Sequence, residues 1–117
     1  MNQNCEHLRP YEGCDLYRGD ALEVLPRLAA SGIIADMVLS DPPYGTTHCR
    51  WDSVIDIPRM WKAVREGSGQ KTPVLLFCQQ PFTSVLGGSN LGRLRYAWVW
   101  ELSLIHISEP TRLQLIS

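Results

Sequence analysis

The sequence lacks most of the features that would assign a protein class directly. No apolar run approaches the roughly 18 residues that cross a bilayer, and the polar residues 1–10 contain no segment of signal-peptide length. The formal net charge is only −1, so the chain has no overall positive field that would attract a phosphate backbone. We therefore expect a cytoplasmic protein with no membrane partner, whose nucleic-acid contacts would have to be local.

Cysteine is too scattered to indicate a metal or redox site. The four cysteines include no Cys-x-x-Cys pair: Cys5, Cys14, Cys49 and Cys78. The neighbouring histidines, His7 and His48, do not complete a regular ligand spacing with them. We expect reduced thiols and no metal.

The sequence does contain an alternation of strand-like and helix-like segments. Strands are predicted at residues 14–18, 33–39, 73–78 and 94–101, and helices after the capping residues Asp20 and Asp56 and at residues 81–86. The apolar run 33–39 should be buried on both faces, and Pro26 should kink the first helix. Strands that alternate with helices predict an α/β fold with a mostly parallel sheet and helices on its faces.

Residues 41–44 are the most informative segment, because they directly follow the predicted strand 33–39. Two consecutive prolines, Pro42 and Pro43, cannot continue a central strand, so the chain must leave the sheet at that strand's carboxyl end. Ligands of open α/β sheets bind beyond the carboxyl ends of the strands. The alternative interpretation is an ordinary Asp-Pro-Pro turn followed by a packed tyrosine.

Asp41, Pro42, Pro43 and Tyr44 resemble the catalytic tetrapeptide of the DNA amino-methyltransferases, which transfer a methyl group from S-adenosylmethionine to the exocyclic amino group of adenine or cytosine. That nitrogen is a poor nucleophile because its lone pair is delocalised into the ring. The resemblance implies that the Asp41 carboxylate and the Pro42 carbonyl accept the two amino hydrogens and free the lone pair. Pro43 would stiffen the loop, and Tyr44 would stack on a base rotated out of the duplex.

The resemblance extends over residues 16–101. Residues 16–20 resemble the strand end of the subgroup in which the catalytic motif precedes the cofactor motif, which implies that Asp20 lies near the cofactor adenosine; capping the following helix is its alternative role. Residues 45–52, 73–82 and 98–101 resemble later segments of phage-type members. The resemblance implies a Rossmann-like fold, of which this chain contains only a part. It also implies that the protein occurs in a bacterial or phage-infected cell. The family's Phe-x-Gly-x-Gly cofactor loop and its target-recognition region do not occur in the sequence.

Residues 102–112 match the translation of a common transposase-based sequencing adapter. We therefore predict two regions, with residues 1–101 as the N-terminal part of a methyltransferase catalytic domain and residues 102–117 as a tail of non-native origin. Leu102 stands where the family usually has lysine, which supports a break at this point. The alternative is a genuine amphipathic strand built on Leu104, Ile105 and Ile107.

Weaker signals receive plainer interpretations. Residues 67–72 hint at a phosphate-binding loop, but the lysine is displaced by one position and no strand precedes the segment. Residues 87–92 are interpreted as a simple glycine-rich loop. Arg50 is interpreted as a solvated arginine rather than a phosphate contact, and Trp51 and Trp61 as packing residues.

The methyltransferase interpretation has two competitors. One is a small non-enzymatic α/β module, with a nucleic-acid-binding or regulatory role, that uses residues 41–44 merely as a turn. The other is methylation of a protein amide, which Asp41 disfavours because the related tetrapeptide generally begins with asparagine. On the favoured interpretation the chain alone should be poorly soluble and inactive, because half a sheet exposes an edge and the side chains of Trp98 and Trp100.

Overall fold

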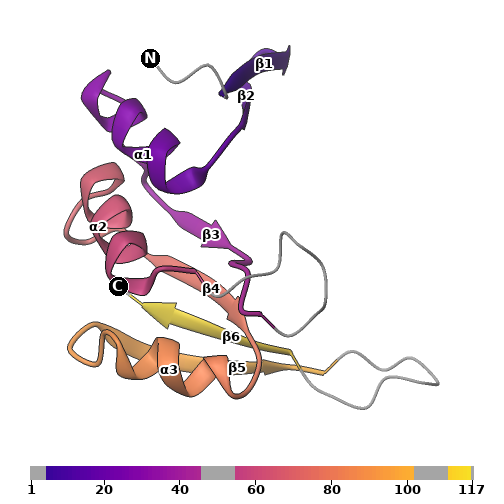
Figure 1. Cartoon of the computed structure of the whole chain (residues 1–117), viewed down its shortest axis with the longest axis vertical. Helices are drawn as coiled ribbons and strands as arrows, with labels where there is room; N and C mark the ends of the chain where they lie inside the picture. Colours follow the sequence, from indigo (N-terminus) through magenta and orange to yellow (C-terminus); the bar gives the residue numbers. More distant parts are fainter. Residues whose placement is uncertain (1–4, 46–54, 102–110, 117) are drawn as a thin grey trace.

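A computed structural model describes the backbone of residues 5–45, 55–101 and 111–116, and the side chains of the first two ranges. Within these ranges the chain is a mixed α/β structure with three helices, a two-stranded sheet and a four-stranded sheet (Figure 1). The strands are β1 (Glu6–Tyr11), β2 (Cys14–Arg18), β3 (Val38–Ser40), β4 (Val74–Cys78), β5 (Leu94–Trp100) and β6 (Thr111–Ile116), and the helices are α1 (Ala21–Ala30), α2 (Ile57–Gly67) and α3 (Phe82–Gly88). The predicted α/β class is confirmed at this level.

β1 and β2 form an antiparallel hairpin at the start of the described chain. β2 confirms the strand predicted at residues 14–18, whereas no sequence pattern predicts β1, because all six of its residues are exposed and show no apolar alternation. The strands turn through Glu12 and Gly13, and Gly13 has a φ of +84°, which glycine adopts without strain. The hairpin forms a sheet separate from the four-stranded one.

Both helix caps predicted from the sequence are confirmed. The Asp20 carboxylate accepts a hydrogen bond from the Leu22 N–H at the start of α1 (2.9 Å), and the Asp56 carboxylate accepts one from the Arg59 N–H in α2 (3.1 Å). α1 continues past Pro26 as one helix.

α2 packs against both of the other helices. Its last residue, Gly67, is buried, and a Cβ at that position would lie 3.6 Å from Leu25 Cδ2 in α1. Trp61 is buried, as predicted for a packing residue, and its indole N–H donates a hydrogen bond to Ser89 Oγ just beyond α3 (2.8 Å). α2 therefore lies against α1 and is linked to the residue that follows α3.

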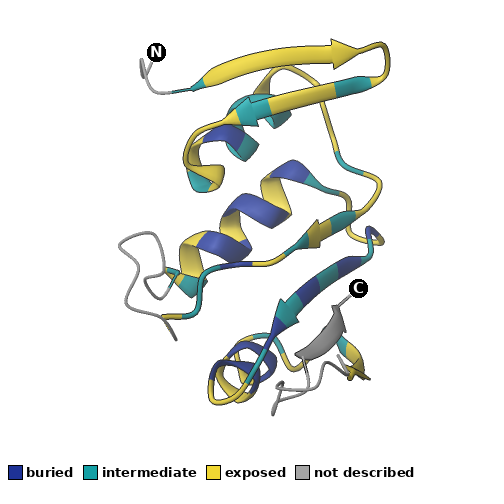
Figure 2. Ribbon diagram, turned by 90° about the vertical axis from the view of Figure 1, so that its right-hand side faces the viewer, coloured by how far each residue is buried: buried dark blue, intermediate teal, exposed yellow. Residues whose placement is uncertain are grey.

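The hydrophobic core lies between α2, α3 and one face of the four-stranded sheet. β3 and β4 are parallel neighbours joined by α2, which gives the expected strand–helix–strand unit. Figure 2 shows the buried residues concentrated on α2, β4 and α3, whereas the β1–β2 hairpin is mostly exposed. The buried cluster consists of alternate residues of β4 with residues of the two helices: Val74, Leu76, Cys78, Met60, Trp61, Val64, Phe82 and Leu86.

The four-stranded sheet is mixed rather than mostly parallel. Its order is β3-β4-β6-β5, and β6 lies antiparallel to both β4 and β5. The two-residue turn between β1 and β2 likewise permits only an antiparallel pair. β3, β4 and β5 nevertheless run in the same direction, because two antiparallel steps through β6 restore it. A Rossmann-like arrangement within the α/β class stays a prediction.

The expectation that residues 33–39 form a strand buried on both faces is wrong. β3 has only three residues, and Leu39 within it is 58% exposed. Ile33 and Ile34 come before the strand and are also exposed. The reason is position, because β3 is the edge strand of the described sheet and α2 covers only one of its faces.

Candidate functional site

Asp41 lies where the sequence predicts. It directly follows Ser40, the last residue of β3, at the carboxyl end of the parallel β3–β4 pair. Its side chain is exposed, whereas Pro42 next to it is buried. The chain therefore leaves the sheet with a buried proline as its anchor and an acidic side chain directed to solvent.

The rest of the tetrapeptide is fixed by contacts with more distant parts of the chain. The Pro43 carbonyl oxygen accepts a hydrogen bond from the Ile55 N–H (3.3 Å). The Tyr44 ring stacks on Phe82, with ring centroids 5.3 Å apart and planes 23° from parallel. Phe82 is 4% exposed, so the tyrosine is attached to the hydrophobic core. Together these contacts hold residues 42–44 in a defined position.

The Asp41 carboxylate has a different environment from these neighbours. In residues 5–45 and 55–101, no hydrogen bond or ion pair joins it to another residue. An ionised carboxylate accepts hydrogen bonds and donates none, so it suits a ligand that presents N–H or O–H groups. The combination of a held backbone and an uncommitted acceptor is what a binding or catalytic loop requires.

Phe82 is a site residue that the motif alone does not reveal. It is distant from Asp41 in the sequence and begins α3, close after the end of β4. β3 and β4 are parallel, so their carboxyl ends meet at one edge of the sheet, and the segments that follow them lie together. Phe82 is therefore identified as a site residue by the pairing of β3 with β4 and not by any local sequence pattern.

Asp20 is not brought to the same sheet edge as Asp41. It follows β2, which belongs to the two-stranded sheet, whereas Asp41 follows β3 of the four-stranded sheet. Its carboxylate is used as the cap of α1, through the Leu22 N–H. The alternative role predicted for Asp20 is thus present, and a contact with a cofactor stays a prediction.

A second polar cluster lies on the hairpin. The Asp15 carboxylate accepts hydrogen bonds from Arg9 Nε (2.9 Å) and Arg9 Nη2 (3.2 Å), and it lies 2.7 Å from His7 Nε2, whose ring stacks on Tyr17. The bond from Arg9, followed by that from His7, lowers the pKa of Asp15 below its ordinary value. All four residues lie on β1 and β2, so the cluster stabilises the hairpin.

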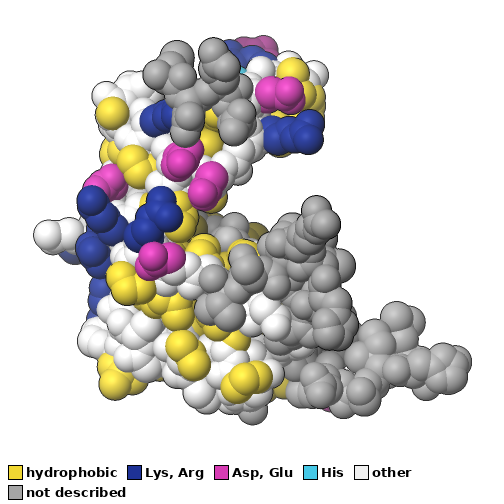
Figure 3. Space-filling model, viewed as in Figure 1, with side chains coloured by type: hydrophobic (Ala, Val, Ile, Leu, Met, Phe, Trp, Pro, Cys, Tyr) yellow, Lys and Arg dark blue, Asp and Glu magenta, His cyan; other side chains and the backbone are white. Residues whose placement is uncertain are grey.

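The described side chains do not form a metal site or a continuous basic surface on the face shown in Figure 3. No group of three or more His, Cys, Asp or Glu residues in residues 5–45 and 55–101 is arranged to hold a metal ion. On that face, Lys and Arg side chains are intermixed with Asp and Glu side chains around α1 and α2. In the same part of the chain, every helix is too short or too polar to cross a bilayer.

Some predicted residues lie outside the described part of the chain. Arg50, Trp51 and His48 belong to residues 46–54, which follow the tetrapeptide, and no structure is assigned to them. Their predicted roles therefore stay predictions.

Comparison with known proteins adds no relative. No protein-family model, no curated protein and no solved structure matches the chain. The functional argument therefore depends on the residues of the Asp41 loop and on their geometry.

Proposed function

We propose that residues 1–101 are the N-terminal part of an S-adenosylmethionine-dependent DNA methyltransferase of the cytoplasm of a bacterial or phage-infected cell. Its target would be the exocyclic amino group of adenine, and that of cytosine is the second choice. One observation carries the proposal: the exposed carboxylate of Asp41 projects from a held loop at the carboxyl end of β3. That is where open α/β sheets bind ligands.

The chemistry needs an acceptor for each amino hydrogen. The Asp41 carboxylate and the Pro42 carbonyl would accept them, which draws the nitrogen toward a tetrahedral geometry and localises its lone pair. A negative carboxylate also stabilises the positive charge that develops on nitrogen during methylation. This requires the carboxylate to be uncommitted before the base arrives, and its lack of partners in the described ranges is consistent with that.

Tyr44 would provide a surface for the extruded base. The Tyr44 ring stacks on Phe82, with ring centroids 5.3 Å apart. Because Phe82 is part of the core, the stacked pair would hold the Tyr44 ring at a fixed angle. Stacking of the base would then cost less conformational entropy than stacking on a mobile side chain, because the Tyr44 ring is already ordered.

The described residues do not by themselves fit S-adenosylmethionine. Asp20 caps α1 and follows the separate hairpin sheet, and the family's glycine-rich cofactor loop is absent from the sequence. We propose that the cofactor is bound mainly by residues encoded downstream in the uninterrupted gene. The direct parallel pairing of β3 with β4, joined by α2, supports a Rossmann-like arrangement for the whole domain.

We also propose that residues 102–117 are of non-native origin. The backbone of Thr111–Ile116 pairs with β4 and β5. Backbone pairing depends on strand geometry and not on the origin of the codons, so it is compatible with either source of the segment. The nucleotide sequence across codons 101 to 113 distinguishes an adapter from a gene.

The decisive experiment uses the uninterrupted open reading frame. Its product should bind S-adenosylmethionine and methylate DNA at an amino group, measured by transfer of a labelled methyl group. Asp41→Ala and Asp41→Asn should each lower the rate by about two to three orders of magnitude without changing the fold. Undiminished methylation by both variants would refute the assigned mechanism, and no binding of S-adenosylmethionine would favour a non-enzymatic module.

A further inference from the structure

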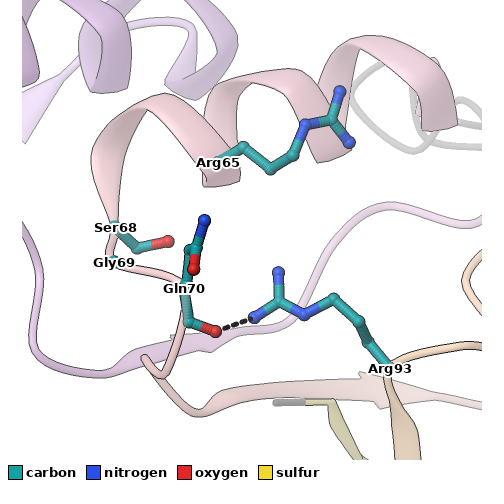
Figure 4. A pocket seen from close by; sticks show the side chains of 5 residues that line it. All are labelled: Arg65, Ser68, Gly69, Gln70 and Arg93. Carbon is teal, nitrogen blue, oxygen red and sulfur yellow. Dashed lines mark hydrogen bonds between the residues drawn. The ribbon is translucent and has the colours of Figure 1, made fainter.

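A cavity of about 450 Å³ lies at the opposite edge of the sheet from Asp41. Its lining comes from the end of α2, the loop that leads to β4 and the turn before β5, and Figure 4 shows the side chains: Arg65, Ser68, Gly69, Gln70 and Arg93. β3, β4 and β5 run in the same direction, so the segments that precede β4 and β5 lie at the amino edge of the sheet. The cavity is therefore separate from the candidate methylation site.

The cavity is positively charged. Among its described lining residues, two are arginines and none is acidic. Arg93 is partly buried, and one of its nitrogens, Nη2, donates a hydrogen bond to the Gln70 carbonyl oxygen (3.1 Å), as Figure 4 shows. Arg65 is exposed and forms no hydrogen bond or ion pair with another residue of the described ranges. A guanidinium has five N–H donors, so both arginines retain donors for a ligand.

One feature opposes an anion here, because the carboxyl end of a helix carries a partial negative charge and α2 ends at this cavity. Two of its last carbonyl oxygens already have partners, which reduces that effect. The Val64 oxygen accepts a hydrogen bond from Ser68 Oγ, and the Gly67 oxygen accepts one from the Ala35 N–H (2.8 Å). The nearby acid on the helix, Glu66, pairs with Lys62 (3.9 Å). The two guanidinium charges therefore contribute most to the electrostatic potential in the cavity.

We propose that this cavity binds the phosphate group of a small phosphomonoester. A monoester carries close to two negative charges at neutral pH, which matches two guanidinium groups, and arginine presents parallel N–H donors that fit phosphate oxygens. A volume of about 450 Å³ is within the range of small-molecule sites, so it has room for an organic group beside the phosphate.

Segment 67–72, which contains two glycines, contributes to the cavity in a way that its sequence does not predict. It follows a helix instead of preceding one, and the Gly69 N–H donates to Thr72 Oγ1 within the loop (2.8 Å). That backbone donor is therefore already used, and the arginines supply the donors to the ligand. The proposal is independent of methyl transfer, and all five lining residues precede residue 102, where the proposed foreign tail begins.

The test is a titration of the 117-residue chain with adenosine 5′-monophosphate and with inorganic phosphate at low ionic strength, followed by ³¹P NMR of the ligand. Both should bind, and Arg65→Gln should weaken binding about tenfold, the value of one charged hydrogen bond. Arg59→Gln is the matched control, since it removes the same charge from α2 at a position that does not line the cavity. It should leave the affinity unchanged.

Two control ligands test which part of the ligand the cavity recognises. Adenosine without phosphate should not bind, and binding equal to that of the monophosphate would refute phosphate recognition. An oligonucleotide without terminal phosphates should bind more weakly than the monophosphate. Tighter binding of the oligonucleotide would refute the phosphomonoester as the ligand and indicate a nucleic-acid backbone instead. No binding of phosphate or monophosphate, or equal losses in Arg65→Gln and Arg59→Gln, would overturn the proposal.

Discussion

Three aspartates in comparable positions allow a direct test of whether Asp41 serves the fold or a ligand. Asp20, Asp41 and Asp56 are all exposed, and each one lies outside a helix or strand, next to its end. Asp20 and Asp56 each accept a hydrogen bond from a helix N–H, at 2.9 Å and 3.1 Å. Asp41 has no such bond in the described ranges. Replacing each by alanine should therefore separate two caps from one uncommitted carboxylate.

The expected magnitudes follow from those contacts. Loss of an N-cap side chain costs about 1 kcal/mol, because a helix N–H loses its acceptor. Loss of an exposed side chain without partners changes the free energy of unfolding by less than about 0.5 kcal/mol. With a urea m-value of roughly 1 kcal/mol per molar for a chain of this size, Asp20→Ala and Asp56→Ala should each lower the unfolding midpoint by about 1 M. Asp41→Ala should shift it by less than half of that.

The assay is urea unfolding followed by tryptophan fluorescence at low protein concentration, since buried Trp61 reports on the core. Asp41→Asn is the control for a turn role, because asparagine keeps the ability to accept turn hydrogen bonds and alanine does not. If Asp41→Ala destabilises as strongly as the cap variants while Asp41→Asn does not, Asp41 is a turn residue. The assignment of its carboxylate to a ligand would then be refuted.

Three further predictions concern the fold. Leu86 in α3 has no exposed surface, so Leu86→Ala should cost about 2 to 5 kcal/mol in chemical unfolding, whereas Leu86→Met should cost less than about 1.5 kcal/mol; equal costs would contradict a tightly packed core. Gly13→Ala should destabilise the hairpin by about 1 to 2 kcal/mol through its positive φ alone, since nothing lies within 4 Å of the added Cβ, and faster amide exchange in β1 and β2 would show it. The pKa of Asp15 should be lower than the ordinary 3.8 in carboxyl NMR titrations, and Arg9→Gln should raise it; because the folded-state pKa is the lower one, the stabilisation is present above pH 3.8 and is lost as pH falls through the folded-state value.

The helices were predictable because their signals are local. Asp20 and Asp56 each cap the helix that follows them, and Pro58 occupies the first turn of α2, where its missing N–H costs nothing. The position of Asp41 was predictable for a similar reason, since an apolar run followed by two prolines must leave the sheet. These features depend on residues a few positions apart, and no tertiary contact changed them.

What was not predictable depends on pairing between distant segments. β1 has only exposed residues, so its strand conformation comes from pairing with β2 and from the turn at Gly13. The antiparallel position of β6 between β4 and β5 is likewise a matter of pairing. The Tyr44–Phe82 contact and the arginine cavity also join residues from different elements. Each of them requires the strand order, which no single segment encodes.

The packing of the sheet bears on whether residues 1–101 form a complete domain. Every residue of β4 is apolar, a pattern typical of strands that are buried on both faces. The described helices cover only the face of Val74, Leu76 and Cys78, to which α2 and α3 contribute the rest of the core. On β4, Leu75 and Phe77 alternate with those buried residues and are only partly buried.

β5, which lies on the far side of β6 from β4, also has exposed apolar side chains. Trp98 and Trp100 remain about half exposed, at 51% and 52%, and the Trp100 ring contacts Phe77 of β4 at 5.8 Å between centroids. An apolar surface of this kind is unfavourable in water and promotes association. The sequence of the sheet suits two covered faces, but the described helices cover only one. This is the arrangement expected of a domain that is interrupted near residue 101. The poor solubility predicted for the chain alone would then be a consequence of the proposed interruption.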